Sequence, residues 1–384
     1  MISEPTCVCA TGGVRAPVRP ANAHGLLGSI LDHGALCELH LTLRPLPGET
    51  WSAACRRLRD ALADHAATPA AMMVLGDCRQ QVEAVTALRR LFGAVNWPVT
   101  WAEGADLGGR PWAGMQVWAV RGAPVEPIEV AGRVLGSQYR DAHARRVLLG
   151  GLGPGRTTGS SPEQARRTFE QLEAVLAQVG LRMAHVARTW FFLDNILAWY
   201  GEFNRVRTDF FRARGVFGGV VPASTGVGAS NPDGAAVTAA ALALEACGTS
   251  AGVAEIPSPA QCPATSYGSS FSRAVEIRAG RCRHVIVSGT ASIAPDGRSA
   301  HPGQLLGQIE LTFAVVGDIL KSRGLEFADT TRATAYFKTA EGAEIFGDWL
   351  ARQGWQGLPV VSAVATVCRE ELLFELELDA ARAD

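Results

Sequence analysis

Three acidic residues alternate with apolar ones near the end of the chain, in the run LFELELD at residues 373–379. Because successive side chains of a β-strand point to opposite faces, Glu375, Glu377 and Asp379 would share one face of a strand. Helices packed on the apolar face would leave these acids in a partly desolvated interior, where the pKa of a carboxyl is raised. Such a group suits general-acid catalysis at neutral pH. A solvated strand face would show the same alternation, so the pattern alone leaves the role open.

The sequence carries no motif for a metal or a nucleotide phosphate. Its nine cysteines show no paired CxxC spacing and its eight histidines form no HExxH motif. We expect the cysteines to be reduced and mostly small core residues. The run GGLGPG at residues 150–155 looks like a phosphate loop, but no GK[ST] ends it. We interpret it as a turn.

Composition excludes several classes of function. The net charge of −1 over 384 residues gives no electrostatic basis for binding nucleic acid or anionic lipid. No apolar stretch is long enough to span a bilayer, and the N-terminus lacks the features of a secretory signal. We therefore expect a cytoplasmic protein that binds neither nucleic acid nor membrane. With 47% hydrophobic residues, the chain can bury large cores in two or three domains.

An internal repeat organises the second and third parts of the chain. Residues 171–193 predict a helix that ends at Gly180 and then a strand at 186–193. Residues 313–338 predict the same order, with Gly324 after the helix. Aligning Gly180 with Gly324 places Arg188 on Arg332 without a gap. Segments at 235–246 and 371–380 close the two units in a similar way.

The first 125 residues follow a looser version of this pattern. Strands are predicted at 36–43, 71–75 and 114–120, and helices at 52–62 and 81–91. Proline-containing segments at 124–127 and 255–263 indicate linkers. We predict an α+β architecture of three units, residues 1–125, 126–262 and 263–384, each a sheet with helices on one face. Three such units suggest a pseudo-threefold arrangement within one chain, and therefore a monomer.

Segments of the second and third units resemble a known family. The run VIVSGTASI at 285–293, followed by PDG at 295–297, is similar to the strand and turn of the trimeric Rid-type (reactive-intermediate deaminase) proteins. The runs RTWFFLDNILAWYGEFNRVR at 188–207, VPASTGVG at 221–228 and TVCREELLFE at 366–375 resemble the chorismatases. Single chains of that family hold three Rid-like (chorismate mutase-like) units. The resemblance covers about two thirds of the chain, and the first unit matches weakly.

The resemblance implies an enzyme that removes pyruvate from chorismate without a metal or an organic cofactor. Its active site would lie in the cleft between the central and C-terminal units. Chorismate carries an enol ether, whose terminal methylene must accept a proton before the ether bond breaks. The family pattern makes Glu375 the proton donor. The implied product, for secondary metabolism, is 3-hydroxybenzoate or a trans-dihydroxycyclohexadiene carboxylate.

Two residues bear on the choice of product. In the resembling family, a cysteine at the place of Cys368 marks the branch that makes 3-hydroxybenzoate by internal attack on the ring. A thiol there could assist proton removal during aromatisation if its pKa were lowered. Ala274, in a predicted strand at 271–277, could line the same pocket, and a methyl there rather than a glycine favours plain hydrolysis. The two indications disagree, and we follow Cys368 in predicting the 3-hydroxybenzoate branch.

Chorismate is a dianion, so its site needs cations and neutral donors. Lysine is scarce, because Lys321 and Lys338 are the only two in the sequence. Glycine in the run SGT at 288–290 would let backbone approach a ligand closely. The candidate binding residues are therefore Tyr200, Arg205, Arg273, Ala274, Gly289, Thr290, Tyr336 and Lys338.

Two other functions fit the same architecture. The first is a Rid-type imine or enamine deaminase, which usually carries an arginine shortly after the proline that precedes its last strand. The corresponding runs here, PAS at 222–224 and PVV at 359–361, lack that arginine. The second is a non-catalytic scaffold that binds a small molecule. Retention of Glu375, Cys368 and the basic residues argues against it.

Overall fold

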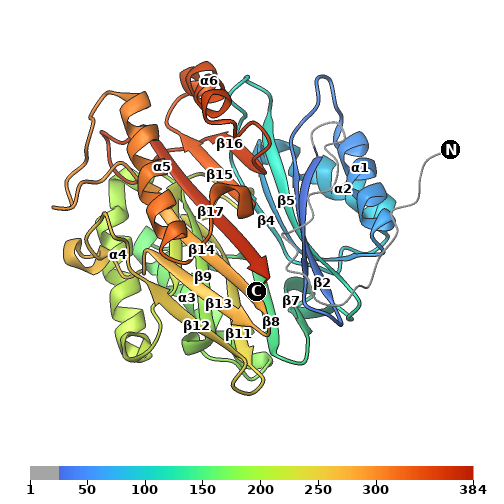
Figure 1. Cartoon of the computed structure of the whole chain (residues 1–384). Helices are drawn as coiled ribbons and strands as arrows, with labels where there is room; N and C mark the ends of the chain where they lie inside the picture. The colour runs from blue at the N-terminus through green and yellow to red at the C-terminus, as the bar shows by residue number, and fades with distance from the viewer. Residues whose placement is uncertain (1–25, 384) are drawn as a thin grey trace.

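The computed structural model describes residues 26–383, which form three sheets with helices packed against them (Figure 1). Residues 1–25, the start of the first predicted unit, and residue 384 lie outside the described residues. The predicted α+β architecture of three units is confirmed.

The N-terminal unit contains a five-stranded sheet in the order β1-β2-β5-β3-β4. Strands β3 and β4 are parallel, and the other neighbours are antiparallel. An apolar cluster that includes Trp51, Leu58 and Met115 joins the sheet to its helices. The elements are β1 (Leu26–Asp32), β2 (Cys37–Leu43), α1 (Trp51–Asp64), β3 (Thr68–Gly76), α2 (Gln81–Phe92), β4 (Val99–Ala102) and β5 (Trp112–Arg121).

The central unit has a six-stranded sheet in the order β10-β9-β11-β8-β7-β6. Its first helix begins at a capping box formed by Ser160 and Glu163 and ends just before Gly180, whose φ is 74°, as the sequence predicts. The elements are β6 (Glu126–Val130), β7 (Arg133–Arg140), β8 (Ala144–Leu152), α3 (Ser161–Gln178), β9 (Val186–Leu193), α4 (Ile196–Ala213), β10 (Ala223–Gly228) and β11 (Val237–Ala246).

The C-terminal unit repeats this plan, with the sheet order β12-β13-β14-β17-β15-β16. Strand β12 pairs with β13, so the third sheet begins before residue 262, where the sequence placed the unit boundary. This edge strand, AGVAEI, consists mostly of small residues and gave no clear strand signal. The elements are β12 (Ala251–Ile256), β13 (Ala274–Ala279), β14 (Cys282–Ala291), α5 (Leu305–Lys321), β15 (Thr330–Phe337), α6 (Ala343–Gln353), β16 (Val360–Val364) and β17 (Phe374–Ala383).

The three sheets share a common interior. Each unit has its own apolar cluster between sheet and helices, whereas a further cluster draws residues from all three sheets, among them Trp118, Trp190 and Tyr336. This shared cluster lies on the sheet faces that the helices do not cover. The units therefore pack sheet to sheet around one centre, and residues of different units meet there.

Strand register makes positions in the three units equivalent. Met73 pairs with both Thr100 and Gln116, Trp190 pairs with both Thr225 and Ala240, and Thr334 pairs with both Val361 and Glu377. Gln116, Ala240 and Glu377 are thus equivalent positions on the last strand of each unit. Two residues earlier on those strands lie Gly114, Thr238 and Glu375. Arg188 and Arg332 are equivalent too, as the repeat alignment predicts.

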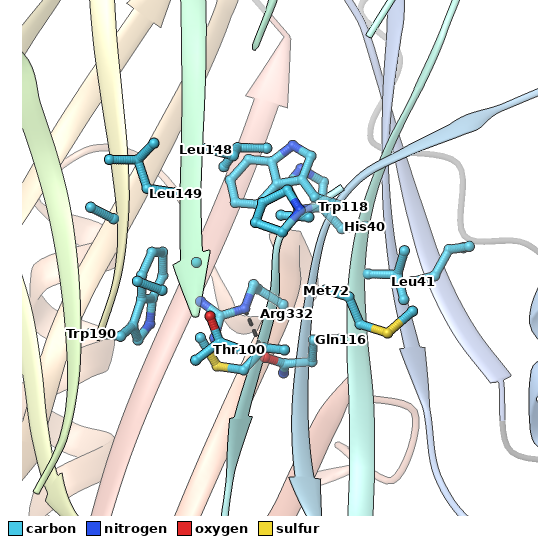
Figure 2. Close-up of a pocket in the computed structure, with 17 residues that line it drawn as sticks. His40, Leu41, Met72, Thr100, Gln116, Trp118, Leu148, Leu149, Trp190 and Arg332 are labelled. Atoms are coloured by element: carbon cyan, nitrogen blue, oxygen red, sulfur yellow. Dashed lines mark hydrogen bonds between the residues drawn. The ribbon is translucent and has the colours of Figure 1, made fainter. Parts of the chain in front are cut away.

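A cavity of about 50 Å³ lies where the N-terminal and central units meet (Figure 2). Trp190 and Ala240 line it from the central unit, and Trp118 and Met72 line it from the N-terminal unit. Arg332 and Gln116, joined by a hydrogen bond of 2.8 Å, also contribute to the lining. Within residues 26–383, no helix has the length and apolar character needed to cross a membrane.

Candidate active site

Glu375 lies near the start of β17, where it pairs with Tyr336 on β15 and with Ala291 on β14. The predicted alternation is confirmed, because Leu376 and Leu378 belong to the apolar cluster under α5. Glu375 lies on the opposite face, toward the centre of the molecule, and is 4% exposed.

The Glu375 carboxyl lies directly against the backbone of Gly289 on β14. A Cβ atom at Gly289 would lie 2.1 Å from Oε1 of Glu375 and 3.2 Å from Cγ2 of Thr225. Non-bonded atoms cannot approach to 2.1 Å, so glycine is required here for space and not for its conformational freedom. The sequence predicted that Gly289 brings backbone close to a ligand, and the group that the structure places against it is the protein's own Glu375.

Burial, reinforced by the nearby charge of Glu377 and opposed by that of Arg188, raises the pKa of Glu375 to about 8. Desolvation is the largest cause, because a charged carboxylate is unfavourable away from water. At neutral pH the group is therefore mostly protonated. A protonated carboxyl at the boundary of two units has the properties of a general acid.

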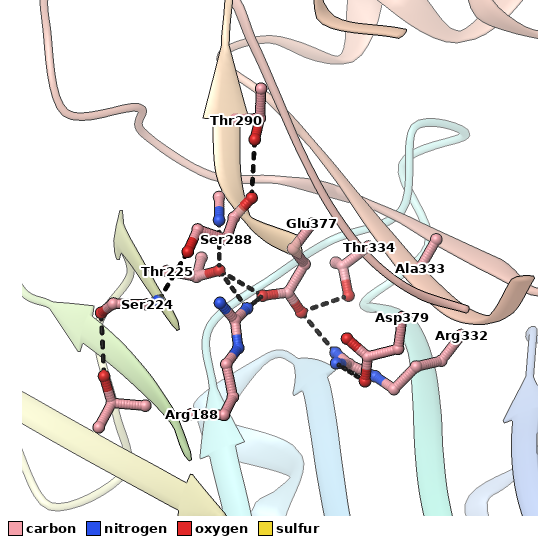
Figure 3. A network of polar contacts seen from close by, with 12 residues as sticks. Arg188, Ser224, Thr225, Ser288, Thr290, Arg332, Ala333, Thr334, Glu377 and Asp379 are labelled. Atoms are coloured by element: carbon pink, nitrogen blue, oxygen red, sulfur yellow. Dashed lines mark hydrogen bonds and ion pairs between the residues drawn. The ribbon is translucent and has the colours of Figure 1, made fainter. Parts of the chain in front are cut away.

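A buried network of charges that begins at Glu377, next to Glu375 on the same face of β17, joins the three units, and Figure 3 shows its part in the central and C-terminal units. Glu377 of the C-terminal unit forms ion pairs with Arg188 of the central unit and with Arg332 of its own unit. Arg332 also binds Asp379 at 3.1 Å and Gln116 of the N-terminal unit at 2.8 Å. Two arginines and two acids thus balance in charge, as buried ions must.

Thr225 connects this network to the wall of the site (Figure 3). Its hydroxyl donates to Glu377 at 2.6 Å and accepts from Arg188 at 2.5 Å and from the backbone N–H of Gly289 at 3.0 Å. Backbone hydrogen bonds between Gly228 and Thr366 join the end of the same strand, β10, to the loop that carries Cys368. The central unit therefore holds in place both the backbone at Gly289 and the loop that carries Cys368.

Cys368 packs against Ala291, Val367 and Leu372 in a small apolar cluster beside β17. Burial, reinforced by the charge of Glu375, raises the pKa of the Cys368 thiol to about 12. The lowered pKa on which a basic thiolate would depend is therefore absent. Cys368 thus lies close enough to Glu375 for its charge to act on the thiol, and the group there is a neutral thiol.

Of the two predicted aromatic residues, Tyr336 pairs with Glu375 across the sheet, whereas Tyr200 packs against the apolar cluster between the sheet and helices of the central unit. Tyr336 is fully buried, and burial raises the pKa of its hydroxyl well above 10. Tyr200, on α4, extends over β10, so that its ring lies 3.7 Å from the place a Cβ atom of Gly226 would take. Thr290 is buried on β14, where its hydroxyl donates to the backbone carbonyl of Ser288.

Four other predicted residues have different surroundings. The side chain of Arg205 is 75% exposed on α4, where it contacts Glu202 at 3.5 Å. Ala274 is fully buried in the cluster under α5, and its cross-strand partner Val287 lies in the same cluster. It therefore faces the helices, away from Glu375, because cross-strand partners share a face.

Arg273 and Lys338 hold loops in place. Two nitrogens of Arg273 donate to the backbone carbonyl of Cys262, at 3.0 and 2.8 Å. Lys338 pairs with the carboxylate of Glu370 at 2.7 Å and also binds its backbone carbonyl. The rarity of lysine directed attention to Lys338, but its contacts are those of a residue that anchors the loop before β17.

Sequence reasoning missed the roles of Arg188, Thr225 and Glu377. Arg188 served only to align the repeats, and its match to Arg332 was the one available signal. The contact of Thr225 with Gly289 joins residues 64 positions apart and left no trace in local patterns. The three residues come from different segments that only the packing of the units brings together.

Comparisons with known proteins agree with this fold. Residues 146–246, most of the central unit, match the family described as endoribonuclease L-PSP. A crystal structure of a chorismatase is similar with a TM-score of 0.61 and 20% sequence identity, and the match covers 82% of this chain and 93% of that one.

Two shorter bacterial structures match single portions of the chain. TdcF of E. coli with bound serine is 22% identical, and the match covers 31% of this chain and 92% of that one, with a TM-score of 0.26. A putative translation initiation inhibitor of Vibrio vulnificus is 24% identical, with 31% and 93% covered and a TM-score of 0.27. Comparison with curated proteins found no match. The chain therefore has the three-unit, Rid-like fold that a chorismatase also has.

Proposed function

We propose that this chain is a chorismatase, which cleaves chorismate with release of pyruvate and uses Glu375 as its general acid. The observation that carries the proposal is a buried carboxyl, with its pKa raised to about 8, at the boundary of the central and C-terminal units. The likeness in fold to a chorismatase supports the proposal over 82% of this chain and 93% of that one.

The proposed chemistry begins with transfer of the Glu375 proton to the terminal methylene carbon of the enol ether. This leaves a cationic carbon bonded to the ether oxygen and a carboxylate at Glu375. A water molecule adds to that carbon and returns one proton to Glu375, and the resulting hemiketal collapses to pyruvate and a ring alcohol. Proximity to the charge of Glu377 disfavours the intermediate carboxylate, so Glu375 readily recovers its proton.

We propose 3-hydroxybenzoate as the product, on the strength of Cys368. In that branch the neighbouring ring hydroxyl, and not water, attacks the ring carbon that bears the ether oxygen, the bond between these two atoms breaks, and pyruvate leaves with the ether oxygen. The hydroxyl gives its proton to the Glu375 carboxylate, the resulting epoxide opens, and the ring carbon that keeps the oxygen loses its proton as the ring becomes aromatic. The thiol pKa of about 12 means that Cys368 takes part as a neutral group. Its contribution would be to shape the apolar wall and exclude water from the cation, while the Glu375 carboxylate accepts the proton.

The carboxylates of the substrate need a cation at the mouth of the site. Arg369 follows Cys368 directly, is half-buried, and acts on the Cys368 thiol through its charge. We propose it in place of Arg205 as the residue that contacts a carboxylate of chorismate. Its guanidinium also binds the backbone carbonyl of Gly297, so the loop holds it in position.

The test is incubation of the purified protein with chorismate, with pyruvate measured by a coupled lactate dehydrogenase assay. We expect release of one pyruvate for each chorismate consumed, and 3-hydroxybenzoate on chromatography of the products. Unchanged chorismate would refute the proposal. A trans-dihydroxycyclohexadiene carboxylate would retain the chorismatase assignment and refute the product branch. An assay with an imine substrate in parallel separates this activity from that of a Rid-type deaminase.

A further inference from the structure

The structure places a second glutamate directly beside the general acid. Glu375 and Glu377 lie on the same face of β17, two residues apart, and both are at least 96% buried. Their environments differ sharply. Glu377 accepts hydrogen bonds from Arg188, Arg332, Thr225 and Thr334, whereas the carboxyl of Glu375 forms no hydrogen bond within the described part of the chain.

Thr225 is the junction between the two glutamates. On one side its hydroxyl donates to Glu377, and on the other it accepts from the N–H of Gly289. The Glu375 carboxyl lies against Gly289 with no room for a methyl group between them, so the Gly289 backbone limits where the carboxyl can lie on that side. Any movement of Thr225 would therefore be transmitted to Glu375.

The equivalent contact elsewhere shows what part of this arrangement is merely structural. Thr100 of the N-terminal unit accepts from the N–H of Gly151 of the central unit, also at 3.0 Å. There the last strand carries Thr238 and Ala240 in place of the two glutamates. The threonine–glycine contact is thus a device that joins units, and only at Thr225 is it linked to a carboxylate.

We propose that Thr225 and Glu377 are positioning residues for Glu375: Thr225 holds the backbone against which its carboxyl lies, and Glu377 pairs with the two buried arginines, so that neither pairs with Glu375. The proposal rests on the proposed function and adds a contribution of the central unit to it. The titratable or charged groups that act on Glu375 or lie next to it are Glu377 on its own strand, Arg188 on β9, Tyr336 on β15 and Cys368 on the preceding loop.

The first test compares three variants by kcat and KM for pyruvate release. Thr225→Val removes the hydroxyl and keeps the shape, so kcat should fall about tenfold or more while KM changes less than about twofold, because misplacement of a catalytic group costs rate. Thr225→Ser keeps the hydroxyl and should restore most of kcat. The matched control Thr100→Val removes the equivalent hydroxyl at the other boundary and should leave kcat unchanged.

Three results would overturn the positioning role of Thr225. They are a wild-type kcat in Thr225→Val, an equal loss in Thr225→Ser, and an equal loss in Thr100→Val. The first would mean that the contact has no effect, the second that packing alone matters, and the third that the contact only supports the fold.

The second test needs no activity and therefore separates this inference from the proposed function. Titration of carboxyl 13C signals, with Glu375 assigned from the Glu375→Gln variant, should give a midpoint near pH 8 in the wild type. Glu377→Gln removes the negative charge and should lower the midpoint. Glu377→Asp keeps the charge and should preserve a raised midpoint.

An unchanged midpoint in a folded Glu377→Gln protein contradicts the role of Glu377. If that variant does not fold, the Glu377→Asp protein decides the question. A wild-type midpoint together with a reduced kcat would support the positioning role, and a midpoint near 4.5 would refute it. If the wild type releases no pyruvate, the proposed function fails, while the titration still measures the effect of Glu377 on Glu375.

Discussion

Two boundaries between units share a backbone plan and differ in chemistry. At the central/C-terminal boundary, Thr225 contacts Gly289, and the adjacent strand presents Glu375 and Glu377. At the N-terminal/central boundary the same contact joins Thr100 to Gly151, but the strand presents Thr238 and Ala240. The first boundary holds a buried acid and a charge network. The second holds an apolar cavity beside Ala240 (Figure 2).

The third boundary shows the same plan with an apolar residue and a glycine at the equivalent positions. Val361 occupies the place of Thr225, and Gly114 occupies the place of Glu375. A Cβ atom at Gly114 would lie 2.8 Å from Val361, so the two units are in direct contact there. Three copies of one scaffold therefore provide one candidate site, and two side chains on the last strand make the difference. Function has been added to the fold at specific positions.

The largest effect should follow removal of the acid from the first boundary. Glu375→Gln keeps the shape and cannot donate a proton, so kcat for pyruvate release should fall by about 10²-fold or more, the usual contribution of general-acid catalysis. Thr238→Val, at the equivalent position of the second boundary, should leave kcat within about twofold. Initial rates with saturating chorismate measure both. Substantial activity in Glu375→Gln would exclude Glu375 as the proton donor.

Displacement of the acid should be nearly as harmful as its removal. In Gly289→Ala the new methyl group would overlap the Glu375 carboxyl, which must move, and kcat should fall by about 10²-fold. The control is Gly252→Ala on β12, where a Cβ atom would meet nothing within 4 Å. Circular dichroism should confirm that both variants fold. A Gly289→Ala enzyme with normal kcat would show that the position of the carboxyl is not critical.

The buried acid at the first boundary should also make the free energy of unfolding depend on pH. Folded Glu375 keeps its proton up to about pH 8, whereas in the unfolded chain it ionises near 4.5. Folding therefore takes up a proton between these values, and the free energy of unfolding decreases as pH rises through this window. Glu375→Gln has no such loss. The difference between its free energy of unfolding and that of the wild type should therefore increase by about a few kcal/mol from pH 5 to pH 8 and then stay level.

Urea denaturation at pH 5, 7 and 9 measures this difference. The control Glu129→Gln changes an exposed glutamate on β6, and its urea midpoint should match that of the wild type at each of the three pH values. A constant difference between Glu375→Gln and wild type over the whole range would mean that the pKa of Glu375 is not raised.

The contrast between boundaries also explains what the sequence could and could not predict. Alternation along β17 and the repeat of Arg188 with Arg332 are local patterns, and they gave the unit plan and the buried acid. Contacts such as Thr225 with Gly289 depend on how whole units pack, and local patterns carry no record of that. Arg205 was predicted as a ligand because arginine binds carboxylates. Residue type does not reveal that its side chain lies on the exposed face of α4.

A smaller effect is expected from the wall of the site. Cys368→Ala removes a neutral thiol, so pyruvate release should change less than about threefold, since the acid remains in place. The product ratio should shift from 3-hydroxybenzoate toward the trans-dihydroxycyclohexadiene carboxylate, because the smaller side chain admits water to the cationic carbon. Chromatography of the products checks this prediction. A large loss of kcat would indicate that Cys368 transfers a proton itself.

The smallest effect should follow substitution of Arg205, and it tests which part of the chain contacts the carboxylates of chorismate. Its side chain is 75% exposed and its contact with Glu202 is long, at 3.5 Å, so the pair contributes little to stability. Arg205→Ala should change KM for chorismate less than about twofold, whereas Arg369→Ala should raise KM at least about tenfold through loss of a charge-assisted contact to a carboxylate. The reverse order would place the carboxylates of chorismate over α4, and the mouth of the site would then lie on the central unit instead of the loop before β17.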